Sequence, residues 1–111
     1  MNKVSLIGNL VKDAEYFEMK EGVRGVIKFT LAVNSGFVKK NGERDVDFIP
    51  ISYWSNHADK ILPFLTKGKQ VAIIGEIKTR HYITEDGTKK YVTEVNANNI
   101  QFLGKSKDTA V

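Results

Sequence analysis

The segment Gly25-Val-Ile-Lys-Phe-Thr-Leu-Ala-Val-Asn34 alternates large apolar side chains with small or polar ones. Successive side chains of a β-strand point to opposite faces, so this pattern predicts a strand with one buried face. The side chains predicted to face the core are Ile27, Phe29, Leu31 and Val33, and those predicted to face solvent are Lys28, Thr30 and Asn34. This strand indicates which side of the sheet carries the core.

A shorter stretch of alternation precedes this segment and predicts a first strand over residues 3–11. Gly8-Asn9 offers a bend where a barrel strand must curl. One face of this strand carries Val4, Leu6 and Leu10. Residues 12–24 are polar and predict a loop or an irregular hairpin.

After residue 34, Asn41-Gly42 is a typical hairpin tip, because both residues tolerate positive φ. A third strand is predicted over residues 45–54. Its two faces carry Asp47, Ile49, Ile51 and Tyr53 on one side and Phe48, Pro50, Ser52 and Trp54 on the other. Pro50 lacks the N–H that a ladder needs, which indicates a strand edge or a bulge.

Helical spacing is confined to residues 56–67, with Gly68 as a stop signal. The apolar positions at i, i+3, i+4 and i+7 are Ala58, Ile61, Leu62 and Leu65. Asn56 is a plausible N-cap, but Pro63 is tolerated only in a first turn. We therefore expect a short, imperfect helix.

Two further strands are predicted over residues 70–78 and 98–103, joined by a long hairpin over residues 79–96 with its tip at Glu85-Asp86-Gly87. The chain is thus mostly β with one helix. Three strands, a helix and two more strands is the order of the OB-fold, a five-stranded Greek-key barrel. We expect such a barrel with long protruding hairpins.

Composition narrows the possible functions. The chain has 111 residues, enough for one core, so we expect one OB-fold domain over residues 1–104 and a short flexible tail over residues 105–111. No cysteine is present, which excludes disulfides, thiolate zinc sites and thiol nucleophiles. The sequence lacks a run of roughly 18 apolar residues and a signal-peptide layout, and we expect a soluble intracellular protein.

Charge alone does not decide the partner. Lys and Arg outnumber Asp and Glu by 17 to 13, which gives a net charge of +4. Such an excess attracts polyanions only if it is concentrated on one face, and otherwise it serves solubility.

Several segments together resemble the bacterial single-stranded DNA-binding protein family over about residues 1–104. They are Asn2-Lys3-Val4, Gly8-Asn9-Leu10, Phe29-Thr-Leu-Ala-Val-Asn34, Asp47-Phe-Ile49, Trp54, Lys67-Gly68, Gly75, Lys78-Thr-Arg80, Tyr91-Val-Thr-Glu-Val95 and Gln101-Phe-Leu103. The resemblance implies an OB-fold homotetramer that binds and protects single-stranded DNA, without sequence preference, in replication, recombination or repair. It also implies no catalysis, no cofactor and a cytoplasmic location, or the host cytoplasm for a phage protein.

Binding of this kind needs aromatic planes for bases and cations for phosphates on one surface. Phe48 and Trp54 lie on one strand face, opposite Ile49 and Ile51, and we expect them to stack bases. Packing against a neighbouring subunit or under a loop is the alternative. Phe37 and Tyr82 fall where the resemblance implies two more stacking aromatics, at positions that are tryptophan in many relatives.

The predicted phosphate contacts are basic residues in or near the two long hairpins. They are Lys28, Lys39, Lys40, Arg44, Lys78, Arg80, Lys89 and Lys90. Any one of them could instead be an ordinary solvated charge. Tyr53 alternates with core residues, which indicates a structural role, whereas Tyr91 is compatible with either role.

Other chemistry has little support in the sequence. His57 and His81 are far apart and lack the companion ligands of a metal site, so we expect no metal. Asp45 and Asp47 share a strand face and are read as a polar rim rather than an acid–base pair. The sequence contains no Gly-rich phosphate loop and no nucleophile elbow, and we expect no enzyme.

The resemblance also implies subunit contacts through the first strand, with Val4 and Leu6 as interface candidates. Relatives usually continue into a linker and an acidic tip that recruits replication and repair enzymes. Residues 104–111 are short and basic, so we expect this recruitment to be absent. An RNA-binding protein, a primosomal dimer of the same superfamily and an interaction module that does not bind nucleic acid remain alternatives.

Overall fold

The computed structural model describes residues 1–18 and 25–103, apart from the side chains of Ser35 and Phe37. The described strands are β1 (Val4–Leu10), β2 (Glu15–Glu18), β3 (Gly25–Val38), β4 (Arg44–Ser55), β5 (Gln70–Ile83) and β6 (Lys89–Phe102). Between β4 and β5 lie α1 (Ala58–Ile61) and the 3₁₀ helix η1 (Leu62–Phe64). The predicted tail, residues 105–111, lies outside the described residues.

Five of these strands form a closed ring. β1 pairs antiparallel with β5 along most of its length and with β3 through Asn9 and Leu10. The ring is completed by antiparallel β3–β4 and β5–β6 pairs and by a short parallel β4–β6 pair. A Cβ atom at Gly8 would lie 2.3 Å from the carbonyl oxygen of Ala32, so glycine permits β1 to cross closely over β3. This is the OB-fold barrel, and the predicted fold is confirmed.

The core fills the barrel with the side chains that alternation predicted to be inward. Ile27 and Leu31 are completely buried, and Phe29 is 6% exposed. Ile51 is buried beside them, while Ile49 and Tyr53 pack against the same cluster from β4. The structural role predicted for Tyr53 is therefore confirmed.

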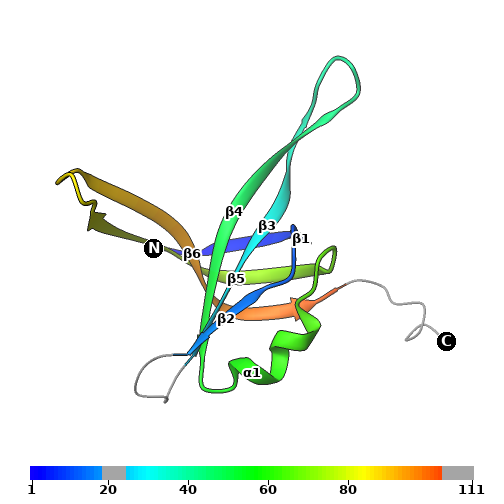
Figure 1. Cartoon of the computed structure of the whole chain (residues 1–111). Helices are drawn as coiled ribbons and strands as arrows, with labels where there is room; N and C mark the ends of the chain where they lie inside the picture. Colours follow the sequence, from blue (N-terminus) through cyan, green and yellow to red (C-terminus); the bar gives the residue numbers. More distant parts are fainter. Residues whose placement is uncertain (19–24, 104–111) are drawn as a thin grey trace.

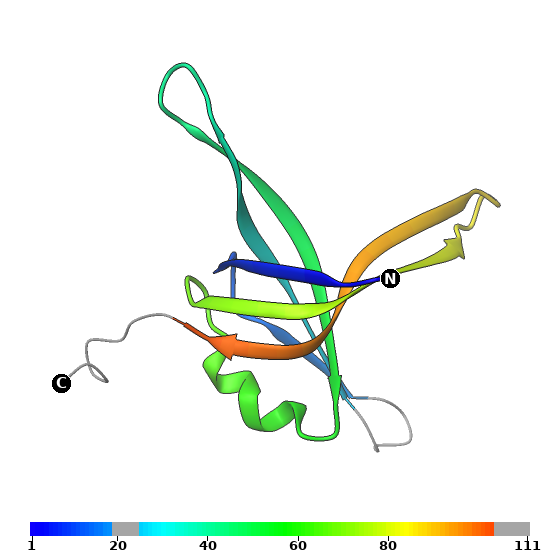
Figure 2. The same cartoon turned by 180° about the vertical axis from the view of Figure 1, so that it is seen from behind.

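The β-strands continue well beyond the barrel as two arms, which diverge in both views (Figures 1 and 2). We define the β3–β4 arm as residues 32–48 and the β5–β6 arm as residues 78–94. The strands predicted over residues 70–78 and 98–103 are β5 and β6, and both are longer than predicted. The predicted hairpin over residues 79–96 consists of their extensions. The predicted tips are confirmed, with Gly42 and Gly87 at positive φ.

A β-bulge lies where β5 ends its pairing with β1, while residues 95–97 of β6, beyond the bulge, still pair with β4. The register shifts between Ile74 and Gly75, because Asn98 is the extra residue on β6. A Cβ atom at Gly75 would lie 2.2 Å from the carbonyl oxygen of Asn96, so the two backbones meet more closely than any side chain allows. A bulge bends its strand and increases the local twist, here just before the β5–β6 arm begins.

The helical segment is shorter than predicted. α1 begins after His57, not Asn56, and no side chain caps it. The Ser55 hydroxyl accepts a hydrogen bond from the His57 N–H at 2.9 Å. Pro63 has no N–H to donate to the carbonyl of Asp59, so the α-helical hydrogen-bond pattern stops and a 3₁₀ turn follows.

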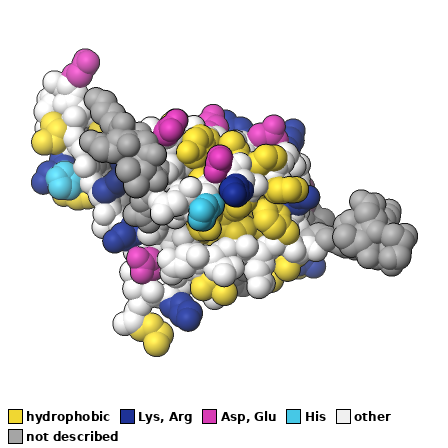
Figure 3. All heavy atoms as spheres, turned by 90° about the horizontal axis from the view of Figure 1, so that it is seen from below, with side chains coloured by type: hydrophobic (Ala, Val, Ile, Leu, Met, Phe, Trp, Pro, Cys, Tyr) yellow, Lys and Arg dark blue, Asp and Glu magenta, His cyan; other side chains and the backbone are white. Residues whose placement is uncertain are grey.

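The end of the barrel that carries α1 exposes hydrophobic side chains among charges of both signs (Figure 3).

β2 lies outside the ring and pairs antiparallel with the first residues of β3. It belongs to the segment read as a loop or an irregular hairpin, and the structure supports the hairpin. Val26, on the outward face of β3, is only 2% exposed because this added strand borders it. Residues 19–24 of the same segment lie outside the described part of the chain.

Candidate nucleic-acid interface

The outward face of β4 presents the two aromatics that alternation predicted there. Phe48 is 64% exposed and Trp54 is 38% exposed. Between them lies Pro50, one residue before β4 begins to pair with β6 at Ile51. The strand edge predicted at Pro50 therefore exists only in the part of β4 that precedes this pairing. The β4 face therefore offers exposed rings instead of a second core.

Trp54 borders a depression that we call the Trp54 groove. Its lining residues are Lys28, Trp54, Lys78, Thr79, Arg80, Glu94 and Asn96. Three predicted phosphate contacts, Lys28, Lys78 and Arg80, thus meet beside a predicted stacking ring. This is the arrangement that a nucleic-acid strand requires, with cations and an aromatic plane on one surface.

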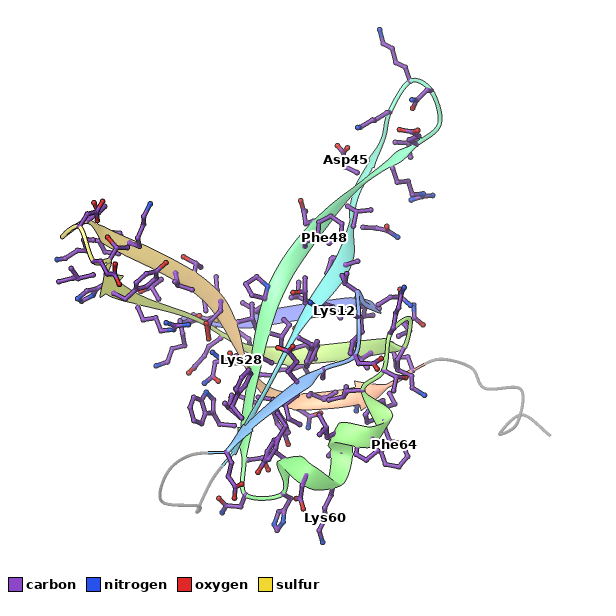
Figure 4. All side chains as sticks on the ribbon, in the orientation of Figure 1. Lys12, Lys28, Asp45, Phe48, Lys60 and Phe64 are labelled. Carbon is purple, nitrogen blue, oxygen red and sulfur yellow. The ribbon has the colours of Figure 1, made fainter. Side chains whose placement is uncertain are left out.

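A second depression, the Pro50 groove, adjoins the first. It is lined by residues of the β1–β2 connection and of β2, β3, β4 and β6, which are Lys12, Asp13, Glu15, Lys28, Phe29, Thr30, Pro50, Ile51, Ser52 and Glu94. Lys28 and Glu94 line both grooves, so the two depressions are adjacent on the outward face, and we call them together the furrow. Figure 4 shows Lys28 near the base of the arms, with Phe48 part-way up the β3–β4 arm.

Glu94 lines both grooves of this furrow, and its place there was not predicted. Its Oε2 accepts a hydrogen bond of 2.6 Å from the Ser52 hydroxyl, and its Oε1 lies 3.5 Å from Nη2 of Arg80. The Glu94 side chain is only 14% exposed and that of Arg80 is 53% exposed, so part of the Arg80 charge is already paired at the edge of the furrow. The sequence feature that could have indicated this position is that Glu94 lies on the polar face of β6, the strand that pairs with β5 and its Arg80.

Asn96 is a second polar group that was not predicted. Its Oδ1 is buried and accepts no hydrogen bond from the described residues. Asn96 also lines the Trp54 groove, so this unpaired buried acceptor belongs to a residue of the groove wall.

The β5–β6 arm extends the same face outward. Lys78, Arg80 and Tyr82 alternate on β5, and Lys90 lies opposite Tyr82 on β6. Tyr82 is 49% exposed. Lys89 points to the opposite face, together with Tyr91, whose ring centroid lies 6.1 Å from that of His81. Lys89 is thus separated from the other predicted contacts of this arm.

The β3–β4 arm carries its basic residues at the tip. Nζ of Lys39 lies 3.1 Å from Oδ1 of Asp45, so part of its charge is already paired. Lys40 and Arg44 are exposed, and Arg44 lies opposite Val38. The side chain of Phe37 lies outside the described part of the structure. Among the described site residues predicted on this arm, Phe48 is two residues from Pro50 on the same face of β4, although it lines neither groove.

Comparison with known proteins now decides the family. The model described as the single-strand binding protein family matches residues 1–103. The chain belongs to this family.

Curated relatives carry the same description. Single-stranded DNA-binding protein 2 of Clostridium acetobutylicum is 42% identical over 111 residues, which is 100% of this chain and 83% of the relative. Single-stranded DNA-binding protein 3 of that organism is 46% identical over 103 residues, 93% of this chain and 71% of the relative. Single-stranded DNA-binding protein A of Bacillus subtilis is 41% identical over 103 residues, 93% of this chain and 59% of the relative.

Other residues of this family member lie away from the furrow. Val4 and Leu6, the predicted interface candidates, are half-buried against the core, whereas Ile7 on the same strand is 58% exposed. Within residues 1–18 and 25–103, no group of three His, Cys, Asp or Glu side chains is placed to hold a metal ion. None of the helices in those ranges is long and apolar enough to cross a membrane.

Proposed function

We propose that this protein binds single-stranded DNA without sequence preference along the furrow on its outward face. Bases stack on Phe48, Trp54 and Tyr82, and Phe37 adds a fourth ring on the β3–β4 arm. The observation that carries the proposal is the Trp54 groove, where an exposed indole adjoins three cationic side chains. Membership of the single-strand binding protein family supports the same ligand.

The phosphate contacts come from the cations that line or flank the furrow. Those along the furrow and the β5–β6 arm are Lys28, Lys78, Arg80 and Lys90, and Lys39, Lys40 and Arg44 extend the contacts at the other tip. Lys89, on the opposite face of its arm, contributes least. Each phosphate contact adds about 0.7 to the magnitude of the slope of log affinity against log salt.

The role is binding, without catalysis, and serves DNA replication, recombination or repair in the cytoplasm. No step of such a role requires a bond to be made or broken. The relatives' printed names, which all specify single-stranded DNA, support this assignment.

We propose in addition that copies of the chain associate, as a homotetramer. Among the described residues, β1 pairs with β3 only at Asn9 and Leu10, which leaves a strand edge over residues 4–8. On the outer face of the adjoining sheet, Ile7 and Ile74 are exposed diagonal neighbours. Val4 and Leu6 then support the interface from the core side. Sedimentation of wild type and Ile7→Asp tests this: a tetramer that the substitution dissociates is expected, and a monomeric wild type would contradict it.

Binding is tested by titrating oligo-dT at low salt while the fluorescence of Trp54, the single tryptophan, is recorded. A base stacked on the indole quenches it, so quenching that weakens with salt is expected. Duplex DNA and an RNA oligomer of equal length serve as competitors. No quenching at low salt, or equal affinity for duplex, would reject the stacking mode, and a preference for RNA would reassign the ligand.

A further inference from the structure

β2 brings a further aromatic ring to the binding face. In the antiparallel β2–β3 ladder, Phe17 lies opposite Val26, and in the β3–β4 ladder Val26 lies opposite Trp54. Directly opposed residues of neighbouring strands project from the same side of a sheet. Phe17, Val26 and Trp54 therefore form one row across three strands on the outward face.

Both rings at the ends of this row are accessible. Phe17 is 45% exposed and Trp54 is 38% exposed, while Val26 between them is 2% exposed. Val26 is not part of the core cluster inside the barrel, so its burial comes from neighbours on the outward side. Phe17 helps to cover Val26 and still presents nearly half of its own surface to solvent.

A cation lies beside this ring. Nζ of Lys28 is 6.0 Å from the centroid of the Phe17 ring, at the outer limit of a cation–π contact. Lys28 is also the basic residue that lines both the Trp54 groove and the Pro50 groove. The ammonium group thus lies next to the path from one ring to the other.

The spacing suits an extended strand. Two strand separations put the backbones of Phe17 and Trp54 about 10 Å apart. A nucleic-acid strand that crosses β3 between them presents its phosphate to Lys28 while its bases reach the rings on either side. Stacking on an aromatic ring tolerates any base, because every base has a π-face.

We propose that Phe17 is a base-stacking platform, so that single-stranded DNA stacked on Trp54 continues across β3 to Phe17 with a phosphate beside Lys28. The proposal rests on the proposed function and deepens it. It extends the binding surface from the barrel onto β2, a strand outside the ring. The occupant is a nucleobase of the same single strand.

A double variant, Trp54→Phe with Phe17→Trp, tests this directly by moving the single tryptophan to β2. Oligo-dT is expected to quench its fluorescence to an extent similar to that of Trp54 in the wild type. The matched control is Trp54→Phe with Phe64→Trp, since Phe64 is 58% exposed in η1, away from the furrow (Figure 4). The control is expected to stay unquenched.

The outcomes separate the two proposals. Quenching of wild-type Trp54 without quenching of tryptophan at position 17 would overturn the role of Phe17 and leave the proposed function intact. Absence of quenching at both positions would overturn both. Equal quenching in the Phe64→Trp control would show a non-specific effect and also overturn the role of Phe17.

A second variant separates stacking from packing. Phe17→Leu keeps an apolar cover over Val26 but removes the π-face, and it is expected to weaken binding of labelled oligo-dT about 5- to 150-fold at an unchanged melting temperature. Phe17→Tyr keeps the ring and is expected to bind as the wild type does. Wild-type affinity in Phe17→Leu would overturn the proposal.

Discussion

The β3–β4 arm and the β5–β6 arm are both long hairpins with basic residues, yet they join the barrel differently. β5 and β6 pair without interruption from Gly75 to Ile83, whereas the β3–β4 ladder shifts register between Asn34 and Val38. Lys78 and Arg80 of the β5–β6 arm line the Trp54 groove at the base of that arm. The basic residues of the β3–β4 arm lie at its tip.

Under the proposed binding mode, this difference teaches that the number of cations on an arm does not determine its contribution to binding. We expect a cation to contribute when a strand held by the stacking rings also passes it. The β5–β6 arm meets this condition because its face continues from the groove. The β3–β4 arm carries the ring of Phe48, but its cations lie at the tip, where Lys39 is paired with Asp45 at 3.1 Å.

The largest expected effect concerns two rings on the outward face of β4, Trp54 beside the Trp54 groove and Phe48 on the β3–β4 arm. Trp54→Leu is expected to lose about 1–3 kcal/mol of binding free energy, and Phe48→Leu less, because Phe48 lines neither groove. Anisotropy of labelled oligo-dT measures both. Melting curves provide the control, since Trp54 also borders Val26. A larger loss in Phe48→Leu would reverse the comparison.

The second effect concerns charge. Lys78→Ala with Arg80→Ala is expected to reduce the magnitude of the salt slope by about 1.4, at about 0.7 per phosphate contact. The matched pair, Lys39→Ala with Lys40→Ala, is expected to reduce it by less, because these two lysines lie at the tip of the β3–β4 arm and line neither groove. Binding isotherms across a salt series give both slopes. Equal reductions would mean that the two arms contact phosphates equally.

A smaller effect follows from the ion pair itself. Asp45→Asn frees the Lys39 ammonium group and is expected to raise the magnitude of the salt slope by at most about 0.7. The Asp47→Asn variant, on the same strand face but outside this pair, is the control and is expected to change the slope less. A slope in Asp45→Asn below that of the wild type would show that Lys39 needs its partner in order to bind.

The smallest effect distinguishes the two tips by pH. Hydrogen bonds from the Thr84 hydroxyl and then from Thr88 lower the pKa of Asp86 below its ordinary value of 3.8. A lowered pKa stabilises the tip above that ordinary value, and the contribution is lost as pH falls through the lowered pKa. At the other tip, the neutral amide of Asn41 accepts the equivalent hydrogen bond from the Glu43 N–H.

NMR of the two tips checks this difference. Amide signals of Thr88 are expected to move on acidification below pH 3.8, and those of Glu43 to show no change caused by Asn41. Asp86→Asn serves as the control, because it keeps the acceptor and removes the titration. A transition at the β5–β6 tip that persists in Asp86→Asn would contradict the assignment.

Sequence reasoning succeeded where a side-chain pattern repeats over many residues. β3 and β4 alternate regularly, and this fixed the inward set with Ile27 and Leu31 and the outward pair Phe48 and Trp54. Closure of the barrel followed from the order of the elements and the resemblance. Tyr53 was read as structural for the same reason, because it alternates with core residues.

Sequence reasoning failed where the structure depends on contacts between residues that are far apart in the chain. The bulge at Gly75 requires the close approach of the Asn96 backbone, which no local pattern records. β2 has only four residues, too few to show alternation, so Phe17 was passed over as part of a polar loop. The roles of Glu94 depend on Ser52 and Arg80 coming together from three strands.

The central claim is that single-stranded DNA follows the furrow on the outward face, and NMR mapping of the whole chain with oligo-dT tests it most directly. Amide shifts are expected to concentrate around Lys28, Trp54 and Arg80 and to be small at Ile7 and Ile74, on the outer face of β1 and β5. Large shifts at Ile7 and Ile74 with unchanged signals around Trp54 would contradict the account.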